Sequence, residues 1–254
     1  MLRVLACILA ASFLFAPVAR AETYHLQYEA GVLGVVTLGQ VEYEVTANAQ
    51  RYGVRASLRT AGAARIFDQT EITAATSGTV AGNGLTWGRY DLSHAFAGHK
   101  FRRTALTHTG GGVSADINPR YSSMGQPPTS AAQQAASYDP LTAIFALGRQ
   151  IGAARACNGS ALVFDGRTHY RIAVAPKSQG NFTGGGYNGP SLTCTFTYTP
   201  IAGFSVHENG RIPQAEAVFA LPAQPGFAAP LRLTVPTPVG NAQLDVRSYQ
   251  QLAN

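Results

Sequence analysis

A β-hairpin is predicted by the stretch Cys157-Asn-Gly-Ser-Ala-Leu-Val-Phe164-Asp165-Gly166-Arg167-Thr-His169-Tyr170. A short apolar run precedes Asp165-Gly166, and residues 168–175 alternate between two faces after it. A two-residue turn needs positive φ, which glycine adopts freely and aspartate tolerates better than most residues. Alternation with a period of two is typical of a half-buried strand. The sequence therefore predicts two antiparallel strands that meet at Asp165-Gly166.

Residues 1–21 are predicted to be a signal peptide. Arg3 gives a positive start, residues 4–18 are apolar, and Ala19-Arg20-Ala21 fits a small-x-small cleavage site. The apolar run is short for a membrane span. We therefore expect cleavage after Ala21, a periplasmic location, and a mature chain without a transmembrane segment. Residues 22–254 are expected to form a single β-rich periplasmic domain.

The two cysteines of the mature chain, Cys157 and Cys194, are predicted to form a disulfide. Cys194 lies in residues 191–199, the clearest strand pattern of the chain, on the same face as Leu192 and two aromatic residues. An even number of cysteines in an oxidising compartment favours pairing. A closed loop of this size would stabilise the fold by roughly 3–4 kcal/mol. Two separate buried thiols are the alternative.

The composition favours a rigid exported protein over a nucleic-acid-binding one. Charged residues make up 13% of the chain, against about 25% in average proteins. The formal net charge is +6, and the loss of Arg3 and Arg20 leaves +4 (6 − 2). Basic residues are scattered, with one cluster at residues 99–103, whereas a nucleic-acid surface needs a basic stripe. We expect no nucleic-acid partner.

Turn signals at short, regular spacing separate a long series of alternating segments. This rhythm favours an antiparallel meander that curls into a barrel or sandwich. Besides the hairpin above, strands are predicted at residues 23–30, 35–47, 51–60, 66–75, 84–92, 100–108, 113–117, 191–199, 204–207, 215–221, 231–235 and 242–249. Residues 180–189 are predicted to be a glycine-rich loop.

One helix is predicted, near residues 139–150. Asp139 can cap its first N–H groups, and Pro140 fits the first helical position. Leu141 and Phe145 contribute to an apolar face, and a glycine, Gly148 or Gly152, is expected to end the helix. The proline-containing residues 119–137 before it are predicted to be a surface connection.

Residue patterns typical of catalysis are weak in this chain. No serine-nucleophile motif or phosphate-binding loop is present, and the histidines are dispersed. Asp165, Arg167 and His169 lie near one hairpin tip, but charged groups in turns usually face solvent or hydrogen-bond locally. We therefore expect no catalytic residue, no metal ligand and no cofactor.

Two motifs occur in the order found in a known family. They are Asp139-Pro140-Leu141-Thr142-Ala143 and Phe164-Asp165-Gly166-Arg167-x-x-Tyr170, the second flanked by Cys157 and Cys194. In these motifs the chain resembles a proteobacterial periplasmic family of unknown function, similar in pattern to β-spiral proteins linked to cell-envelope integrity. The resemblance implies a mainly β fold: a strongly curved antiparallel sheet, a β-spiral or open barrel, with one helix. It brings no catalytic residues.

Together these features favour an exported, non-enzymatic protein that supports cell-envelope integrity. A curved sheet can leave an apolar cleft, so a lipid or acyl group is the expected ligand. One alternative is an assembly module that docks an envelope protein through an open sheet edge. A hydrolase with an unrecognised site is the other.

Overall fold

A computed structural model describes residues 21–34, 36–66, 69–82, 84–96, 100–205, 214–238 and 240–253. The predicted signal peptide lies outside these residues except for Ala21. The strand predicted at residues 204–207 lies partly outside them, and its described residues, Phe204 and Ser205, are not in a strand.

One antiparallel sheet of thirteen strands makes up most of the described chain, with the order β7-β6-β5-β4-β3-β2-β1-β13-β12-β11-β10-β9-β8. The strands are β1 (Glu22–Val32), β2 (Val36–Ala47), β3 (Arg51–Thr60), β4 (Glu71–Ala81), β5 (Gly84–Phe96), β6 (Lys100–Thr109), β7 (Gly112–Asn118), β8 (Gly159–Phe164), β9 (His169–Gly184), β10 (Tyr187–Ala202), β11 (Ala215–Ala220), β12 (Pro230–Thr237) and β13 (Gly240–Ala253).

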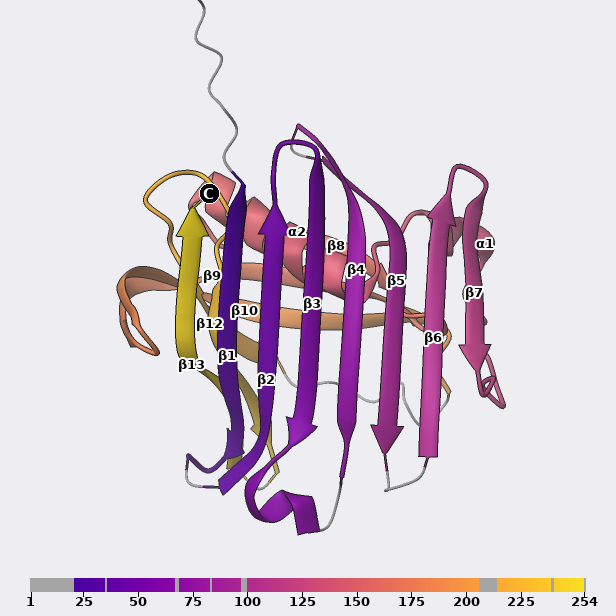
Figure 1. The fold of residues 1–254 in the computed structure, drawn as a ribbon, viewed down its shortest axis with the longest axis horizontal. Coiled ribbons are helices and arrows are strands. Elements are labelled where there is room, and N and C mark those ends of the chain that lie inside the picture. Colours follow the sequence, from indigo (N-terminus) through magenta and orange to yellow (C-terminus); the bar gives the residue numbers. More distant parts are fainter. Residues whose placement is uncertain are drawn as a thin grey trace, which may run out of the picture.

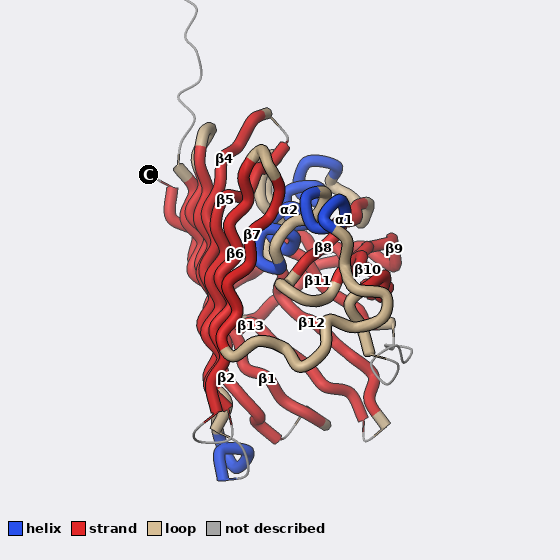
Figure 2. The backbone as a smooth tube through the Cα atoms, turned by 90° about the vertical axis from the view of Figure 1, so that its right-hand side faces the viewer, coloured by secondary structure: helices blue, strands red, loops and turns tan. Residues whose placement is uncertain are grey.

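The sheet folds over on itself without closing. Its first seven strands form one layer, and β8 to β12 lie across from them, with the chain's ends joined by pairing of β1 with β13 (Figures 1 and 2). The edge strands β7 and β8 do not pair with each other. The predicted mainly β, strongly curved antiparallel sheet is therefore confirmed as an open, barrel-like arrangement.

The helix α2 (Pro140–Ala154) lies between the two layers and packs against both of them (Figure 2). Leu141, Phe145 and Ala146 pack into a core with the inner face of the first layer. Leu147 and Ile151 pack into a second core with the inner faces of β8 to β11. Both faces of the helix are therefore buried, and the sheet curves around it.

The helical content differs from the prediction in three places. A short helix, α1 (Ala131–Ala135), lies within the predicted surface connection and contacts β7. A 3-10 helix, η1 (Gly62–Ile66), precedes β4, which begins five residues later than the strand predicted from residue 66. Helix α2 continues to Ala154, past both glycines, and ends at Arg155 with φ 50°.

The two glycines continue the helix because another segment packs directly against them. The backbone N–H of Ala228 donates a hydrogen bond to the carbonyl oxygen of Gly148 (2.9 Å). A Cβ atom on Gly152 would lie 2.0 Å from the carbonyl oxygen of Gly226. The missing side chains thus admit residues 226–228 against the helix, and tertiary packing overrides the low helix propensity of glycine.

Replacing Gly152 with alanine is expected to destabilise the protein by about 2 kcal/mol. Helix propensity alone predicts a gain of about 1 kcal/mol, but the new Cβ forces a packed backbone segment to move, which costs about 1–3 kcal/mol or more. Urea unfolding of Gly152→Ala measures the sign. Ala153→Gly, at an exposed position of the same helix, is the control and should cost only about 1 kcal/mol. A stabilised Gly152→Ala would contradict the packing argument.

The predicted glycine-rich loop at residues 180–189 is mostly strand. Strands β9 and β10 pair from Gly184 and Tyr187 inward, so Gly185 and Gly186 alone form the turn. Their φ values are 59° and 83°, as a two-residue turn between right-twisted strands requires. Glycine content was a poor guide here because only these two positions need positive φ.

Candidate functional site

The Asp-Gly motif joins β8 to β9, but through a longer loop than predicted. Phe164 pairs with His169, so the loop holds four residues and the predicted two-residue turn is wrong. The Asp165 carboxylate accepts hydrogen bonds from the backbone N–H groups of Arg167 (2.9 Å) and Thr168 (2.7 Å) and from the Thr168 hydroxyl (2.5 Å). This side chain organises the loop locally, as aspartate commonly does in turns.

The same loop rests on the opposite layer of the sheet. Gly166 has φ 102°, and a Cβ there would lie 2.9 Å from Cγ2 of Thr104 on β6. The carbonyl oxygen of Arg167 accepts a hydrogen bond from the Thr129 hydroxyl (2.9 Å). The loop therefore contacts the opposite layer at the place where the two edge strands of the sheet, β7 and β8, do not pair.

The aromatic residues that follow this loop, His169 and Tyr170, lie in different surroundings. Tyr170 stacks on Tyr198 with ring centroids 4.6 Å apart. His169 is buried, neither of its ring nitrogens has a hydrogen-bond partner, and burial followed by the charge of Arg171 lowers its pKa. Asp165 accepts its hydrogen bonds from Arg167 and Thr168, and within the described residues the imidazole of His169 has no hydrogen bond to it.

Asp139 is more than a helix cap. Its side chain accepts from the backbone N–H groups of Leu141 and Thr142, both at 3.0 Å, at the start of α2. Its other oxygen accepts from the hydroxyls of Thr142 (2.5 Å) and Thr76 (2.9 Å), the latter on β4. The Tyr52 hydroxyl on β3 lies 2.9 Å from the Thr142 hydroxyl. A fully buried carboxylate thus ties the start of the helix to the sheet.

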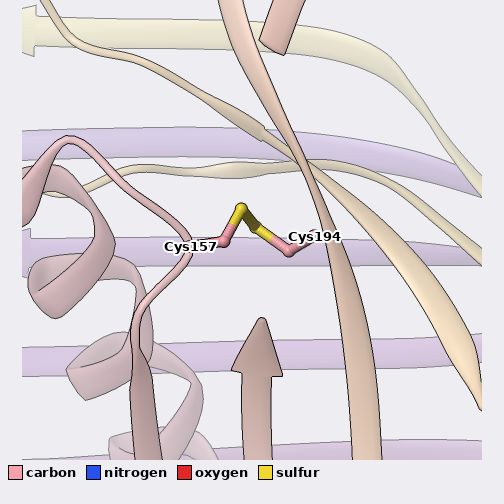
Figure 3. Close-up of a disulfide and its surroundings, with 2 residues drawn as sticks. All are labelled: Cys157 and Cys194. Atoms are coloured by element: carbon pink, nitrogen blue, oxygen red, sulfur yellow. A yellow bond between two sulfur atoms is a disulfide. The ribbon is translucent and has the colours of Figure 1, made fainter. Parts of the chain in front are cut away.

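Cys157 and Cys194 form a disulfide between the loop after α2 and strand β10 (Figure 3). Both residues are buried in the core that the helix shares with β8 to β11. The bond fixes the C-terminal end of α2 against the inner face of the sheet. The helix is therefore held at both ends, by a carboxylate at one and by a covalent bond at the other.

A cleft of about 510 Å³ opens beside the middle of this helix, at the end of the sheet that carries the β2–β3 and β4–β5 connections. Three largely buried aromatic rings lie in its wall: Phe227 lies 5.2 Å from Tyr24 and 5.4 Å from Phe145, between ring centroids. Val45, on β2, adds an aliphatic surface. The volume falls within the range of pockets that bind small molecules, about 300–1,000 Å³.

Two charged side chains stand at this aromatic cleft. Glu22 accepts a hydrogen bond from the Tyr24 hydroxyl (3.2 Å). Arg149 donates to the carbonyl oxygen of Gly82 (3.2 Å), and its guanidinium carbon lies 5.8 Å from the Phe145 ring centroid. Arg149 therefore stays at the mouth with no carboxylate paired to it in the described structure.

The described lining of the cleft combines apolar side chains with two charged ones, Glu22 and Arg149. Its described lining holds no serine, cysteine or histidine. Burial and then the negative charge of Glu22 raise the pKa of Tyr24, so its hydroxyl stays protonated at neutral pH. A second cleft of about 310 Å³ also lies along α2 and shares Arg149 and Ala153 with the first. The arrangement can hold an apolar group and pair one anionic group with Arg149.

The sequence predicted the residues that hold helix α2 in place, but not the residues that line the cleft. Asp139, Pro140 and the two cysteines position the helix, yet Tyr24, Arg149 and Phe227 were not singled out. The lining comes from β1, α2 and residues 225–227, which are far apart in sequence. The four-residue spacing of Phe145 and Arg149 on one helix face was the available signal.

Within the part of the chain that the structure describes, no three His, Cys, Asp or Glu side chains are grouped to hold a metal ion. None of the described helices has the length and apolar character needed to cross a bilayer.

A solved structure shares the fold of this chain, whereas no known sequence family matches it. No family model and no curated protein matches the chain. The crystal structure of a beta-barrel-like protein of the domain of unknown function DUF1849, from Brucella abortus, is similar over 92% of this chain and 98% of that one, with a TM-score of 0.52 and 11% identity. At this identity the likeness shows the fold alone. The chain thus shares its architecture with a proteobacterial protein of unknown function.

Proposed function

We propose that this protein is an exported, non-enzymatic component of the cell envelope that binds a ligand with an apolar chain and an anionic head. The aromatic cleft beside α2 is the observation that carries this proposal, because rings line its wall and Arg149 stands at its mouth. The periplasmic location follows from the signal peptide predicted at residues 1–21. The resemblance of the sequence motifs to envelope-integrity proteins supports the envelope role.

The chemistry of the cleft matches a fatty acid or the acyl part of a phospholipid. An alkyl chain against Tyr24, Phe145 and Phe227 would be removed from water, at about 0.8 kcal/mol for each methylene group buried. A carboxylate or phosphate beside Arg149 would form a charge-assisted hydrogen bond. Helix α2, which carries Phe145 and Arg149, is fixed at its two ends. The cleft is therefore largely formed before the ligand arrives.

Replacing Arg149 with glutamine is expected to weaken binding of a dansyl-labelled C11 fatty acid about tenfold or more. A hydrogen bond between charged groups contributes about 1.5–3 kcal/mol, which corresponds to about 10–100-fold in affinity. Ala153→Trp, which adds a ring at an exposed helix position lining both clefts, should weaken binding by filling the space. Titration of the fluorescence of the labelled acid measures both effects.

The control is Arg171→Gln, an exposed position on β9 outside the cleft, which should leave the affinity unchanged. The matching alcohol should bind wild-type and Arg149→Gln protein equally, since it carries no charge for Arg149. Melting temperatures verify that each variant is folded. If wild-type protein binds neither compound, or Ala153→Trp binds as tightly as wild type, the cleft is not an acyl site.

The exposed edge of β7 supports a second candidate function, docking of an envelope protein by strand addition. In the described structure β7 pairs with β6 alone, and Ser114, Ala115 and Asp116 are exposed. The opposite edge is partly occupied, because Tyr138 exchanges backbone hydrogen bonds with Leu162 and Phe164 of β8. A photo-crosslinking residue at Ser114 should then capture one specific protein in the periplasm, and one on the outer face of β9 at Arg171 should not.

A further inference from the structure

Apolar side chains are exposed at the end of the sheet opposite the cleft. This end carries the β1–β2, β3–β4 and β5–β6 connections, at the bottom of Figure 1. Leu33 is 60% exposed in the β1–β2 connection, and Phe101 is 48% exposed at the start of β6. Val36 and Leu38, at the start of β2, are exposed as well. We call these four residues the end patch; strands β3, β4 and β5 separate Phe101 from the other three. They are half of the large exposed hydrophobic residues in the described chain.

The backbone holds one member of the end patch in an unfavourable conformation. Leu33 has φ 57°, a left-handed conformation that side chains other than those of glycine, asparagine and aspartate rarely adopt. The leucine side chain lies beside Gly240, where an added Cβ would come within 2.2 Å of its Cδ2, but most of it is exposed. Strained residues of this kind are found preferentially at functional sites, and the turn at Gly240 leaves Leu33 largely open to solvent.

Cations surround the end patch. Arg59 at the end of β3, Arg65 in η1 and Lys100 at the start of β6 are exposed, and none forms an ion pair in the described structure. Glu71, at the start of β4, is the exposed carboxylate among them. Asp68, which lies outside the described residues, is a second carboxylate of the β3–β4 connection, so the three cations exceed the two carboxylates by one (3 − 2).

We propose that this end of the sheet docks on an anionic lipid bilayer. Apolar side chains on separate hairpin ends can enter the headgroup region, and lysine and arginine around them attract anionic headgroups. A second copy of the chain fits less well, because it would bring the same three cations against each other. The inference is independent of the acyl-binding proposal, since the cleft lies at the opposite end of the sheet.

Sedimentation with lipid vesicles tests the proposal. Wild-type protein should bind vesicles containing about one-third phosphatidylglycerol and should bind phosphatidylcholine vesicles far more weakly, since each cation near an anionic surface contributes about fivefold. Leu33→Asn should weaken binding about tenfold through the loss of the apolar side chain. Asparagine suits φ 57° better than leucine, so this variant should be at least as stable as wild type. Lys100→Gln should lower binding about fivefold.

The matched control is Leu252→Asn. Leu252 is 48% exposed near the end of β13, away from the end patch, and its replacement should leave vesicle binding unchanged. The proposal is overturned if wild-type protein does not sediment with the anionic vesicles, if Leu33→Asn sediments as wild type does, or if light scattering shows a dimer that Leu33→Asn dissociates. Fatty-acid binding in the cleft should be the same in Leu33→Asn and wild type, which separates the two proposals.

Discussion

Replacing Cys157 and Cys194 together with alanine is expected to lower the free energy of unfolding by about 4 kcal/mol. The bond closes a loop with a sequence separation of 37 residues, and constraining the unfolded chain over that length accounts for about 4 kcal/mol in the chain-entropy model. Both sulfur atoms are buried between α2 and β10, so the folded state also loses contacts. Urea unfolding under oxidising conditions measures the difference.

Reduction provides the control for this prediction. Dithiothreitol should bring the stability of the wild-type protein close to that of the double alanine variant and leave the variant unchanged. The loosened end of α2 carries Arg149 and Ala153, so affinity for the labelled fatty acid should fall with stability. A double variant within about 1 kcal/mol of wild type would show that the disulfide does not constrain the unfolded chain as the entropy model requires.

The strands could be predicted from sequence because alternation is a local property. Residues 191–199 place Leu192 and Cys194 on one face, and the structure buries both. The short, regularly spaced turns in the sequence also predicted that the sheet would be curved. Errors arose where glycine was interpreted without its neighbours: Gly152 continues a helix because Gly226 packs against it, and Gly180 lies within a strand.

The site was less predictable than the fold because it depends on contacts between distant segments. Asp139 is visible in the sequence as a helix cap, but its contact with Thr76, 63 residues earlier, is not. The cleft needs the aromatic ring of Tyr24 beside that of Phe227, which are far apart in the sequence. Only the order of strands in the sheet, in which β1 pairs with β13, brings them together.

Replacing Asp139 with alanine is expected to lower the free energy of unfolding by about 3–4 kcal/mol. Loss of a helix N-cap costs about 1–2 kcal/mol, and each buried hydroxyl left without its acceptor, on Thr76 and Thr142, costs about 1–3 kcal/mol. The alanine variant no longer buries a negative charge, and this gain offsets part of the lost free energy of unfolding. Asp139→Asn keeps an oxygen for the backbone N–H groups of Leu141 and Thr142, so it should cost only about 1 kcal/mol.

The pH dependence of stability separates the charge of Asp139 from its hydrogen bonds. Burial raises the pKa of Asp139, and the hydrogen bonds from Thr142, Thr76 and Leu141 oppose that rise without cancelling it. The folded state therefore holds this proton at pH values where the unfolded chain has released it. It follows that Asp139 stabilises the fold less as pH rises from the ordinary aspartate pKa to the raised value, and that its contribution is constant above that range.

Asp139→Asn removes this titration, so the difference in unfolding free energy between wild type and variant isolates it from every other carboxylate. The difference, wild type minus Asp139→Asn, should be largest at about pH 4 and should fall toward pH 7, because only the wild-type protein must bury a carboxylate at the higher pH. Urea unfolding of both proteins across this range measures it. A difference that rises with pH would mean that the hydrogen bonds from Thr76, Thr142 and the helix start outweigh burial. Asp139 would then hold the helix beside the cleft as a favourable buried anion.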